Sequence, residues 1–513
     1  MTRRTQRRTL ADVLRSHGRT RPDRLAFADG DVQLTWAEAD ARVTRVARAL
    51  QSEGVTAGDR VLWLGQNSFR LQELLLACCK LGALFCPANW RQQPDELAFV
   101  IDDLAPTVVV WQHHEVGPAV AAGRARTRAA ARWIAHDDGE YEQWLGAIPR
   151  DTTDPDGDLG ADAPLLLVYT AAFEGRPNAA MLPSQALLGQ GLLMAQWSGI
   201  DDRYVFLNSG PLFHIGTFMP NLSTFATGGT NVFVARAEGA EICRAIDRYR
   251  CTGGFIVGPM VDAIVAADPD GRYDLSSFRG KRGHPDFDAR VQPDASPWGR
   301  NAGGYGQTEV MGMATFNLLG AGGAGSHGRP SPLVDVQVVD DDDRTLPAGA
   351  TGEITVRGLT VMCGYWNRSE LNASRARNGW HHTNDLGRFE ADGTFSFIGP
   401  KTRMLKSAAE NIYPVEVENC LKTHPAVADA AVIGVPDPTW VQAVKAIVVL
   451  APGATVLPEE LIGHCREHIA SYKKPRSVEF VEAIPRRGLV VDYDALDERF
   501  GGGSYPGGTT RSA

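Results

Sequence analysis

Short apolar runs alternate with helix-like segments along the first 400 residues, and this alternation is the feature that most constrains the fold. Strand-like runs stand at residues 61–64, 84–87 and 107–111, with helix-like segments at 69–81 and 94–101 between them. Alternation of this kind predicts layered α/β structure, in which helices cover sheets of parallel strands. The segment 69–81 is apolar on nearly every side, so we expect it in the core.

Local signals place several element boundaries before any long-range argument is needed. A first helix is expected from Thr9 to Arg19, and Thr35 is a plausible helix start for a segment that reaches Glu53. Gly82 should end the helix over 69–81. The runs 25–27 and 32–36 predict a hairpin around Asp29-Gly30-Asp31.

The chain is too long for one compact core, and its pattern changes near Gly399. With 513 residues, at least two domains are expected. We predict a large domain over residues 1–398, a hinge at 399–403, a small mobile lid over 404–500 and a disordered tail over 501–513. The acidic run Asp340–Asp343 is interpreted as a solvated turn between two strands rather than as a metal site.

Composition excludes several classes of function. The net charge of −9 leaves no basic surplus to neutralise phosphates, which argues against a nucleic-acid partner. No apolar run approaches about 18 residues, so no membrane span is expected. The eight cysteines are scattered and form no CxxC pair, which predicts buried free thiols and a cytoplasmic protein.

One loop carries residues suited to a nucleotide. The stretch Gly303-Gly304-Tyr305-Gly306-Gln307-Thr308-Glu309 combines three glycines, an aromatic ring and a Thr-Glu pair. Glycine allows close approach of a flat ligand, tyrosine offers a face for stacking, and carboxylate and hydroxyl oxygens suit Mg²⁺. Taken alone, the stretch is also typical of an ordinary turn.

Other motifs stand in a fixed order around this loop. They are Tyr169-Thr170 with Gly175-Arg176-Pro177, Gly352-Glu353-Ile354, Gly364-Tyr365-Trp366, Thr383-Asn384-Asp385-Leu386-Gly387 and Glu410-Asn411-Ile412-Tyr413-Pro414. In this order and spacing the chain resembles the adenylate-forming superfamily, which includes acyl-CoA synthetases, from about Leu10 to Phe500. The resemblance implies an α/β fold with a large N-terminal domain of layered subdomains plus a β-barrel-like part, and a small α+β C-terminal lid.

The resemblance also implies a reaction and its participants. A carboxylic acid is condensed with ATP to an acyl-adenylate, the lid rotates, and a thiol of coenzyme A or of a carrier protein attacks. The implied cofactors are ATP or AMP, Mg²⁺ and coenzyme A. A role in secondary metabolism and a homodimer are both consistent with the resemblance. For catalysis the resemblance implies Thr308, Glu309 and His214, and for the nucleotide it implies Thr170, Gly304, Tyr305, Gly306 and Asp385. The implied acid pocket contains His214, Gly303 and Phe218. The implied thiol channel contains Lys406, Ala408 and Asn411, and Glu309 is the implied Mg²⁺ ligand.

The phosphate loop departs strongly from the family pattern. That pattern is roughly Tyr-Thr-Ser-Gly-Thr-Thr-Gly-x-Pro-Lys-Gly, and here residues 169–179 read Tyr-Thr-Ala-Ala-Phe-Glu-Gly-Arg-Pro-Asn-Ala. Asn178 replaces the lysine, and Glu174 adds a negative charge. If Glu174 points inward, two like charges about 4 Å apart repel by roughly 4 kcal/mol at an effective dielectric near 20.

Further departures affect the C-terminal region. Val490 stands where the family has a lysine that stabilises charge on the reacting carboxylate and α-phosphate. Arg403 and Pro400 replace hinge-motif residues, Ala408 and Ala409 replace glycines, and Asn384 replaces another glycine. Arg176, Arg486 or Arg487 could supply the lost positive charge.

Three readings remain open at this point. The chain is an acid–thiol ligase, or a relative with altered chemistry that runs only a later acyl-transfer step or a diazotase-like reaction, or an inactive nucleotide- or acyl-binding protein.

We expect ordinary adenylation to be weak, because each lost electrostatic contact to developing charge typically costs about 10²–10³ in rate. The triple substitution Asn178→Lys, Val490→Lys and Glu174→Thr should therefore raise acid-dependent pyrophosphate release, measured against the unmodified chain. Robust pyrophosphate release by the unmodified chain would show that another cation has replaced the lysines.

Overall fold

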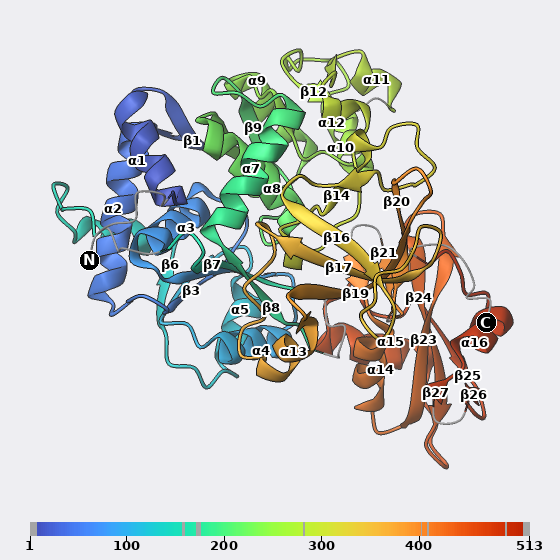
Figure 1. Ribbon diagram of the computed structural model, residues 1–513. Helices are drawn as coiled ribbons and strands as arrows, with labels where there is room; N and C mark the ends of the chain where they lie inside the picture. Colours follow the sequence, from blue (N-terminus) through green and yellow to red (C-terminus); the bar gives the residue numbers. More distant parts are fainter. Residues whose placement is uncertain are drawn as a thin grey trace.

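The computed structural model describes residues 8–155, 160–170, 176–280, 283–401, 403–407, 410–487 and 490–505. Figure 1 shows a large N-terminal part, coloured blue to orange, and a smaller C-terminal part in orange and red. The predicted α/β architecture with a large and a small domain is confirmed.

Two mainly parallel sheets form the centre of the large domain. The first has the order β6-β5-β3-β4-β7-β8, and only β8 runs antiparallel to its neighbour. Its strands are β3 (Arg60–Leu64), β4 (Leu84–Pro87), β5 (Val108–Trp111), β6 (Arg132–Ala135), β7 (Pro164–Tyr169) and β8 (Ala179–Pro183). The second has the order β11-β9-β10-β1-β2, with β1 (Leu25–Asp29), β2 (Val32–Thr35), β9 (Val205–Asn208), β10 (Thr230–Phe233) and β11 (Gly253–Gly254).

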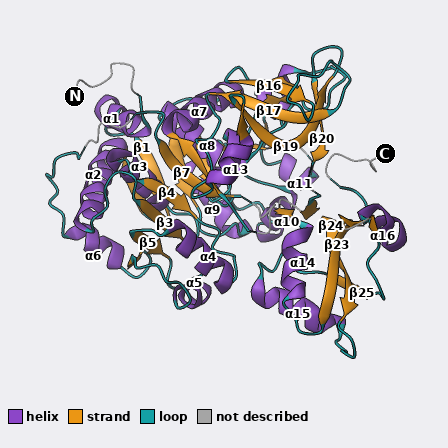
Figure 2. Ribbon diagram, turned by 60° about the horizontal axis from the view of Figure 1, so that its bottom comes forward, coloured by secondary structure: helices purple, strands orange, loops and turns teal. Residues whose placement is uncertain are grey.

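Helices lie between these sheets and over their outer faces, as both views show (Figures 1 and 2). Those of the first half are α1 (Leu10–Thr20), α2 (Trp36–Ser52), α3 (Phe69–Leu81), α4 (Pro94–Leu104), α5 (Gly117–Arg124) and α6 (Glu140–Gly146). Those that follow are α7 (Ser184–Ser198), α8 (Ile215–Thr227), α9 (Gly239–Tyr249), α10 (Gly258–Ala267), α11 (Pro285–Asp288), α12 (Pro297–Arg300) and α13 (Ser369–Arg375).

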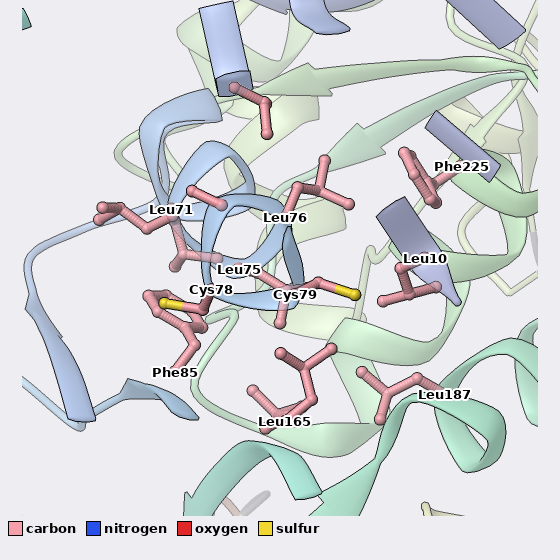
Figure 3. Close-up of a cluster of buried hydrophobic side chains, with 14 of the residues drawn as sticks. Leu10, Leu71, Leu75, Leu76, Cys78, Cys79, Phe85, Leu165, Leu187 and Phe225 are labelled. Carbon is pink, nitrogen blue, oxygen red and sulfur yellow. The ribbon is translucent and has the colours of Figure 1, made fainter. Parts of the chain in front are cut away.

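Helix α3 occupies the middle of the main core. Every residue of α3 except Arg70 is buried, which confirms the expectation from its apolar sequence. Figure 3 shows its leucines and cysteines meeting Phe85 of one sheet, Leu10 of α1 and Phe225 of α8. Because apolar side chains leave this helix in all directions, it joins both sheets into one core.

The helix boundaries follow the local signals. Helix α1 has a capping box in which Thr9 Oγ1 accepts from the Asp12 amide while Asp12 accepts from the Thr9 amide. Thr35 and Glu38 form the same arrangement before α2. Gly82 ends α3 at φ 77°, in the left-handed region that glycine tolerates. The predicted starts and stops at Thr35 and Gly82 are confirmed.

A third, antiparallel sheet completes the large domain. It contains β16 (Val334–Val339), β17 (Gly352–Gly358), β18 (Ala376–Arg377), β19 (Trp380–Phe389) and β20 (Phe395–Pro400). This half-barrel corresponds to the β-barrel-like part. The acidic run Asp340–Asp343 lies between the paired strands β16 and β17, as predicted.

Short elements connect the larger ones. They are β12 (Arg279–Gly280), β13 (Gln292–Pro293), β14 (Thr315–Phe316), β15 (Arg329–Pro330) and the 3₁₀ turns η1 (Thr308–Val310) and η2 (Asn317–Leu319).

The C-terminal domain has its own sheet and its own core. The sheet contains β21 (Leu405–Ser407), β22 (Glu410–Ile412), β23 (Val427–Asp437), β24 (Val441–Leu450) and β25 (Ser477–Phe480), while β26 (Arg486–Arg487) and β27 (Val490–Val491) form a separate two-stranded pair. The helices of this domain are α14 (Pro414–Lys422), α15 (Pro458–His468) and α16 (Tyr493–Phe500). Apolar residues of β23, β24, α14 and α15 form one core under this sheet.

The chain beyond α16 folds back onto the C-terminal domain. The Gly434 amide donates to Tyr505 Oη over 2.9 Å, and Tyr505 Oη donates to Asp497 over 2.7 Å. Arg403 lies over the rings of Tyr505 and Tyr493 at 4.0 and 4.9 Å and pairs with Asp497. The predicted disordered tail therefore does not describe residues 501–505, and residues 506–513 lie outside the described part of the chain.

The cysteines and the helices can be compared with the expectations from composition. All eight cysteines are free thiols, and seven are buried as expected, but Cys363 is exposed at the start of the Gly364-Tyr365-Trp366 segment. Within the described residues, none of the helices combines the length and apolar character needed to cross a bilayer.

Charged side chains join the two domains. Lys473 of the C-terminal domain pairs with Glu96 of α4 at 2.7 Å and with Glu416 of α14 at 2.6 Å. Arg91 of the large domain pairs with Glu410 of β22 at 2.7 Å. Because Lys473 is almost fully buried, loss of one partner leaves its charge poorly compensated.

We expect Glu96→Gln to weaken the contact between the domains, because glutamine keeps the helix-capping role of Glu96 but not its charge. Tryptic cleavage beside Lys401 and Arg403 should then be several-fold faster than in wild type, as measured by gel electrophoresis. Asp95→Asn is the matched control, since Asp95 forms an exposed pair with Arg126. Equal cleavage rates for both variants would contradict the expectation.

Candidate active site

A cavity of about 570 Å³ lies where the two domains meet. Its walls come from the ends of β4 and β7, the loop before α8, the 304–309 loop, β19 and the β21–β22 hairpin of the C-terminal domain. Of the residues singled out from the sequence, it brings together His214, Thr170, Gly304, Tyr305, Gly306, Thr308, Glu309, Asp385, Lys406 and Asn411.

Two of the predicted site residues lie elsewhere, and a third is not described. Phe218 is buried in α8 within the main core and does not line the cavity. Gly303 is also absent from the lining, and its carbonyl accepts from the Asn317 amide over 2.9 Å. Ala408 lies outside the described residues.

The glycines of the 304–309 loop serve the packing of the loop itself. A Cβ at Gly306 would lie 1.5 Å from the carbonyl oxygen of Gly312, and one at Gly304 would lie 2.1 Å from that of Thr315. These positions exclude any side chain because backbone occupies the space. The sequence predicts that this room lets a ligand approach, and the structure adds a packing role, because the absence of side chains lets Tyr305 lie against residues 312–315.

Tyr305 and Asp385 form a buried polar pair. Tyr305 Oη donates to Asp385 Oδ2 over 2.8 Å, and Gln307 Nε2 donates to the same oxygen over 2.6 Å. Burial raises the pKa of Asp385 to about 7, although both hydrogen bonds act in the opposite direction. The tyrosine ring stacks on Phe397 with centroids 5.3 Å apart.

Glu309 stands in the short turn η1 with its side chain buried. Tyr365 Oη donates to Glu309 Oε1 over 2.8 Å, which fixes one carboxylate oxygen. Burial raises the pKa of Glu309. Thr308 lines the cavity beside it, so a hydroxyl and a carboxylate face the same space.

These oxygen ligands fit Mg²⁺ only in part. No group of three or more acidic, histidine or cysteine side chains suited to a metal occurs among the described residues. Mg²⁺ is commonly held by one or two carboxylates together with substrate phosphates. The donor set at Thr308 and Glu309 matches that mode rather than a closed metal cage.

His214 and Glu410 connect the large domain to the β21–β22 hairpin. His214 Nε2 lies 3.4 Å from Glu410 Oε1, and Arg91 Nη2 lies 2.7 Å from the same oxygen. Burial would raise the pKa of Glu410, but His214 and Arg91 outweigh it and lower the pKa to about 2. Lys406 and Asn411 of the same hairpin are joined by a 2.8 Å hydrogen bond.

The two ends of the phosphate loop are held together. The amide and hydroxyl of Thr170 both donate to the Asn178 carbonyl, at 2.9 and 3.2 Å. Residues 171–175, including Glu174, lie outside the described residues. The Asn178 side chain is buried outside the cavity lining and accepts from Arg368 Nε over 2.8 Å. A lysine at position 178 would lie beside the positive charge of Arg368. We therefore expect the increase in pyrophosphate release to come from Glu174→Thr and Val490→Lys.

The arginines considered as substitutes lie elsewhere. Arg176 is exposed and lies over the ring of Phe99 at 5.1 Å. Arg486 pairs with Asp429 at 2.6 Å. Neither lines the cavity. The side chain of Arg487 lies outside the described residues.

Several cavity residues were missed by sequence reasoning. Arg375, His327, Phe397 and Lys473 all line the cavity. The Phe397 amide donates to His327 Nδ1 over 3.2 Å, so the ring carries its proton on Nε2 when neutral. A histidine within a glycine-rich loop was the available signal for His327, but only the fold brings it beside Phe397 and Tyr305.

The raised pKa of Asp385 predicts a pH effect on stability. The ordinary pKa is 3.8 and the folded-state pKa is about 7, so the unfolded chain loses this proton first as pH rises. The stability that Asp385 contributes to the folded state therefore decreases as pH rises from about 4 to about 7. Asp385→Asn, which keeps an acceptor for Tyr305 and Gln307, should be more stable relative to wild type at pH 8 than at pH 4 in urea unfolding.

Asp343 provides a control of opposite sign. A hydrogen bond from Arg377 lowers the pKa of this partly exposed carboxyl. Asp343→Asn should therefore lose stability relative to wild type at pH 8, not gain it. The same pH trend in both variants would contradict the burial argument.

Comparisons with known proteins agree with this geometry. The model for the AMP-binding enzyme family matches residues 14–366, and that for the AMP-binding enzyme C-terminal domain matches residues 416–488. A feruloyl-CoA synthase from Amycolatopsis sp. is 36% identical over 482 residues, covering 92% of this chain and 94% of that protein.

Two other similarities extend over nearly the whole chain. An indoleacetate–CoA ligase from Aromatoleum aromaticum is 32% identical, covering 94% of this chain and 96% of that protein. The structure of an amide bond synthetase from Marinactinospora thermotolerans superimposes with a TM-score of 0.78 at 26% identity, covering 96% of this chain and 100% of that one. With a family match over most of its length and the expected cavity between two domains, this chain is a member of the AMP-binding enzyme family.

Proposed function

We propose that this protein is an AMP-forming acid–thiol ligase. In the first step a carboxylate oxygen bonds to the α-phosphorus of ATP and the bond to the β-phosphate breaks, which releases pyrophosphate. In the second step the sulfur of a thiol, after losing its proton, bonds to the acyl carbon and AMP leaves. The observation that carries the proposal is the meeting of Tyr305–Asp385, Thr308–Glu309 and the β21–β22 hairpin in one cavity.

Tyr305 and Asp385 are suited to the nucleoside. The Asp385 carboxylate has a second oxygen beyond the one that Tyr305 and Gln307 engage, and it can accept a ribose hydroxyl. Tyr305 and Phe397 present aromatic faces beside it, and His327 presents a ring nitrogen at the same wall. These groups recognise an adenosine without needing the phosphate loop.

Thr308 and Glu309 are suited to the phosphates and their Mg²⁺. When bound, Mg²⁺ would neutralise charge on the phosphates and would be held by the Glu309 carboxylate. The hydrogen bond from Tyr365 holds Glu309 in place, and it opposes the effect of burial by favouring the ionised carboxylate.

The acid is proposed to be an aromatic carboxylic acid. Phe213, His214 and Gly304 all line the cavity and give it a partly apolar wall, and the Arg91 guanidinium lies over the Phe213 ring at 5.0 Å. Relatives that act on ferulate and indoleacetate support this class. A ring can stack on Phe213 while its carboxylate faces the phosphate side.

The thiol is proposed to enter along the β21–β22 hairpin, past Lys406 and Asn411, from coenzyme A or a carrier protein. The position of the hairpin against His214 corresponds to a closed arrangement of the two domains. We further propose residues 399–403 as the hinge, with a large domain before it and a lid over 404–500, so that the hairpin can leave the cavity when ATP and acid enter. The two domains have separate hydrophobic cores, which supports this division.

A second candidate is an enzyme that runs only the thiol step on a preformed acyl-adenylate. The losses at Asn178 and Val490 favour it, because they affect charge on the phosphates rather than recognition of the nucleoside. Both candidates share the second step and differ in pyrophosphate release.

The decisive experiment measures pyrophosphate release and thioester formation with a panel of aromatic and aliphatic acids, ATP, Mg²⁺ and coenzyme A. We expect both products with at least one aromatic acid. Glu309→Gln should lower pyrophosphate release by about 10² or more, because a buried charge that positions the phosphates is lost. Glu370→Gln, at an exposed site on α13, serves as control.

Synthetic acyl-adenylate supplied with coenzyme A separates the two candidates. Thioester formation from the adenylate without any pyrophosphate release from ATP would favour the second candidate. Failure of both reactions with every acid would overturn the ligase assignment.

A further inference from the structure

The cavity holds few cations for a reaction on a polyanionic nucleotide. Among the described lining residues, the permanently charged basic side chains are Arg375, Lys406 and Lys473. The phosphate loop and the C-terminal region lack the lysines that the family pattern places there, at Asn178 and Val490. Any replacement for that charge has to come from a side chain that reaches the cavity.

Two of the three cations are poorly suited to the phosphates. Lys473 lies between Glu96 and Glu416, so two carboxylates already compensate its charge. Lys406 belongs to the hairpin of the C-terminal domain, where it bonds Asn411, and burial lowers its pKa. Its position depends on how the two domains meet.

Arg375 differs from both because the large domain holds it. It is the last residue of α13, and the next residue, Ala376, pairs with His381 of β19. Asp385 lies four residues farther along β19. The backbone of Arg375 is thereby tied to the strand that carries the nucleoside-binding carboxylate, whatever the C-terminal domain does.

The charge of Arg375 acts on the groups assigned to the nucleotide. Burial raises the pKa of Glu309 and of Asp385, and the Arg375 guanidinium opposes this rise at both carboxyl groups. It also acts on the phenols of Tyr365 and Tyr413, which line the same cavity. Because Arg375, Glu309 and Asp385 all line this cavity, the guanidinium is available to phosphates bound there.

We propose that Arg375 is a phosphate-binding residue of this enzyme and supplies the positive charge that Asn178 and Val490 do not. The proposal rests on the proposed function, since it assigns a residue to the ATP half of that reaction. It also accounts for the loss of two lysines in a chain that keeps Thr308, Glu309 and Asp385. A guanidinium can bind two oxygens of one phosphate at once, which a lysine cannot do in the same geometry.

The test compares Arg375→Met with Arg377→Met. Arg377 is two residues away, exposed, and engaged with Asp343 and His382 outside the cavity. Arg375→Met should lower acid-dependent pyrophosphate release by about 10² or more. Thioester formation from synthetic acyl-adenylate and coenzyme A should change by less than about threefold. Arg377→Met should leave both rates near those of wild type, and thermal melts would verify that each variant folds.

Binding provides a readout that does not need turnover. Calorimetry with ATP and with adenosine, in Mg²⁺ buffer, should show that Arg375→Met weakens ATP binding at least tenfold and leaves adenosine binding unchanged. Arg375→Lys should recover part of the ATP affinity. In a protein that carries Glu174→Thr and Val490→Lys, the further substitution Arg375→Met should weaken ATP binding less, because a second cation then compensates the phosphate charge.

The outcomes separate this proposal from the proposed function. Absence of pyrophosphate release and of thioester formation in wild type would overturn the ligase assignment, and the ATP-versus-adenosine comparison would still decide the role of Arg375. Equal affinity of wild type and Arg375→Met for ATP, or equal loss of ATP and adenosine binding, would overturn the role of Arg375.

Discussion

Close packing of backbone against backbone at Gly306 is the constraint on which the cavity depends. The Gly312 carbonyl occupies the space of any Cβ at 306, so the loop can take only one path there. That path fixes Tyr305, whose hydroxyl then meets Asp385 on β19. A loop and a strand that are 80 residues apart in sequence are thus held as one wall, before any ligand arrives.

The boundary between the domains depends on charge instead. Glu410 bridges Arg91 and His214, and Lys473 bridges Glu96 and Glu416. The pairs of Lys473 are buried, whereas Arg91 and His214 are partly exposed. A buried ion pair contributes little net stability, because desolvation offsets the attraction, but it penalises any arrangement that leaves one partner alone. Such contacts favour the arrangement seen in the structure, and the separate core of the C-terminal domain supports the proposal that it moves as a unit.

Sequence reasoning was most successful where a local signal decides the structure. The capping residues Thr9 and Thr35, the terminal Gly82 and the apolar segment of α3 act over a few residues, and the structure follows them. The motifs around Tyr305 and Asp385 also correctly predicted residues that meet in one cavity. The packing role of the glycines beside Tyr305 was not predicted, because a pattern of glycines does not say which atoms come close.

Residues whose role depends on tertiary neighbours could not be predicted. Phe218 lies one turn from His214 on α8 but faces the core, and Asn178 faces Arg368 rather than the cavity. Arg375 stands between motifs in an unremarkable polar segment, and only the pairing of β18 with β19 reveals its position. The packing of Tyr505 was hidden in the same way, since a single tyrosine among glycines gives no periodic signal.

The contacts of Arg403 limit how the C-terminal domain can turn. This side chain is enclosed by Tyr493, Tyr505 and Asp497, so it belongs mechanically to the domain that follows it. Lys401, by contrast, pairs with Glu353 of the half-barrel at 3.1 Å and belongs to the domain before it. In the proposed rotation of the C-terminal domain, Lys401 would stay with the half-barrel while Arg403 would move with Tyr493, Tyr505 and Asp497, so these two side chains anchor opposite sides of the proposed hinge.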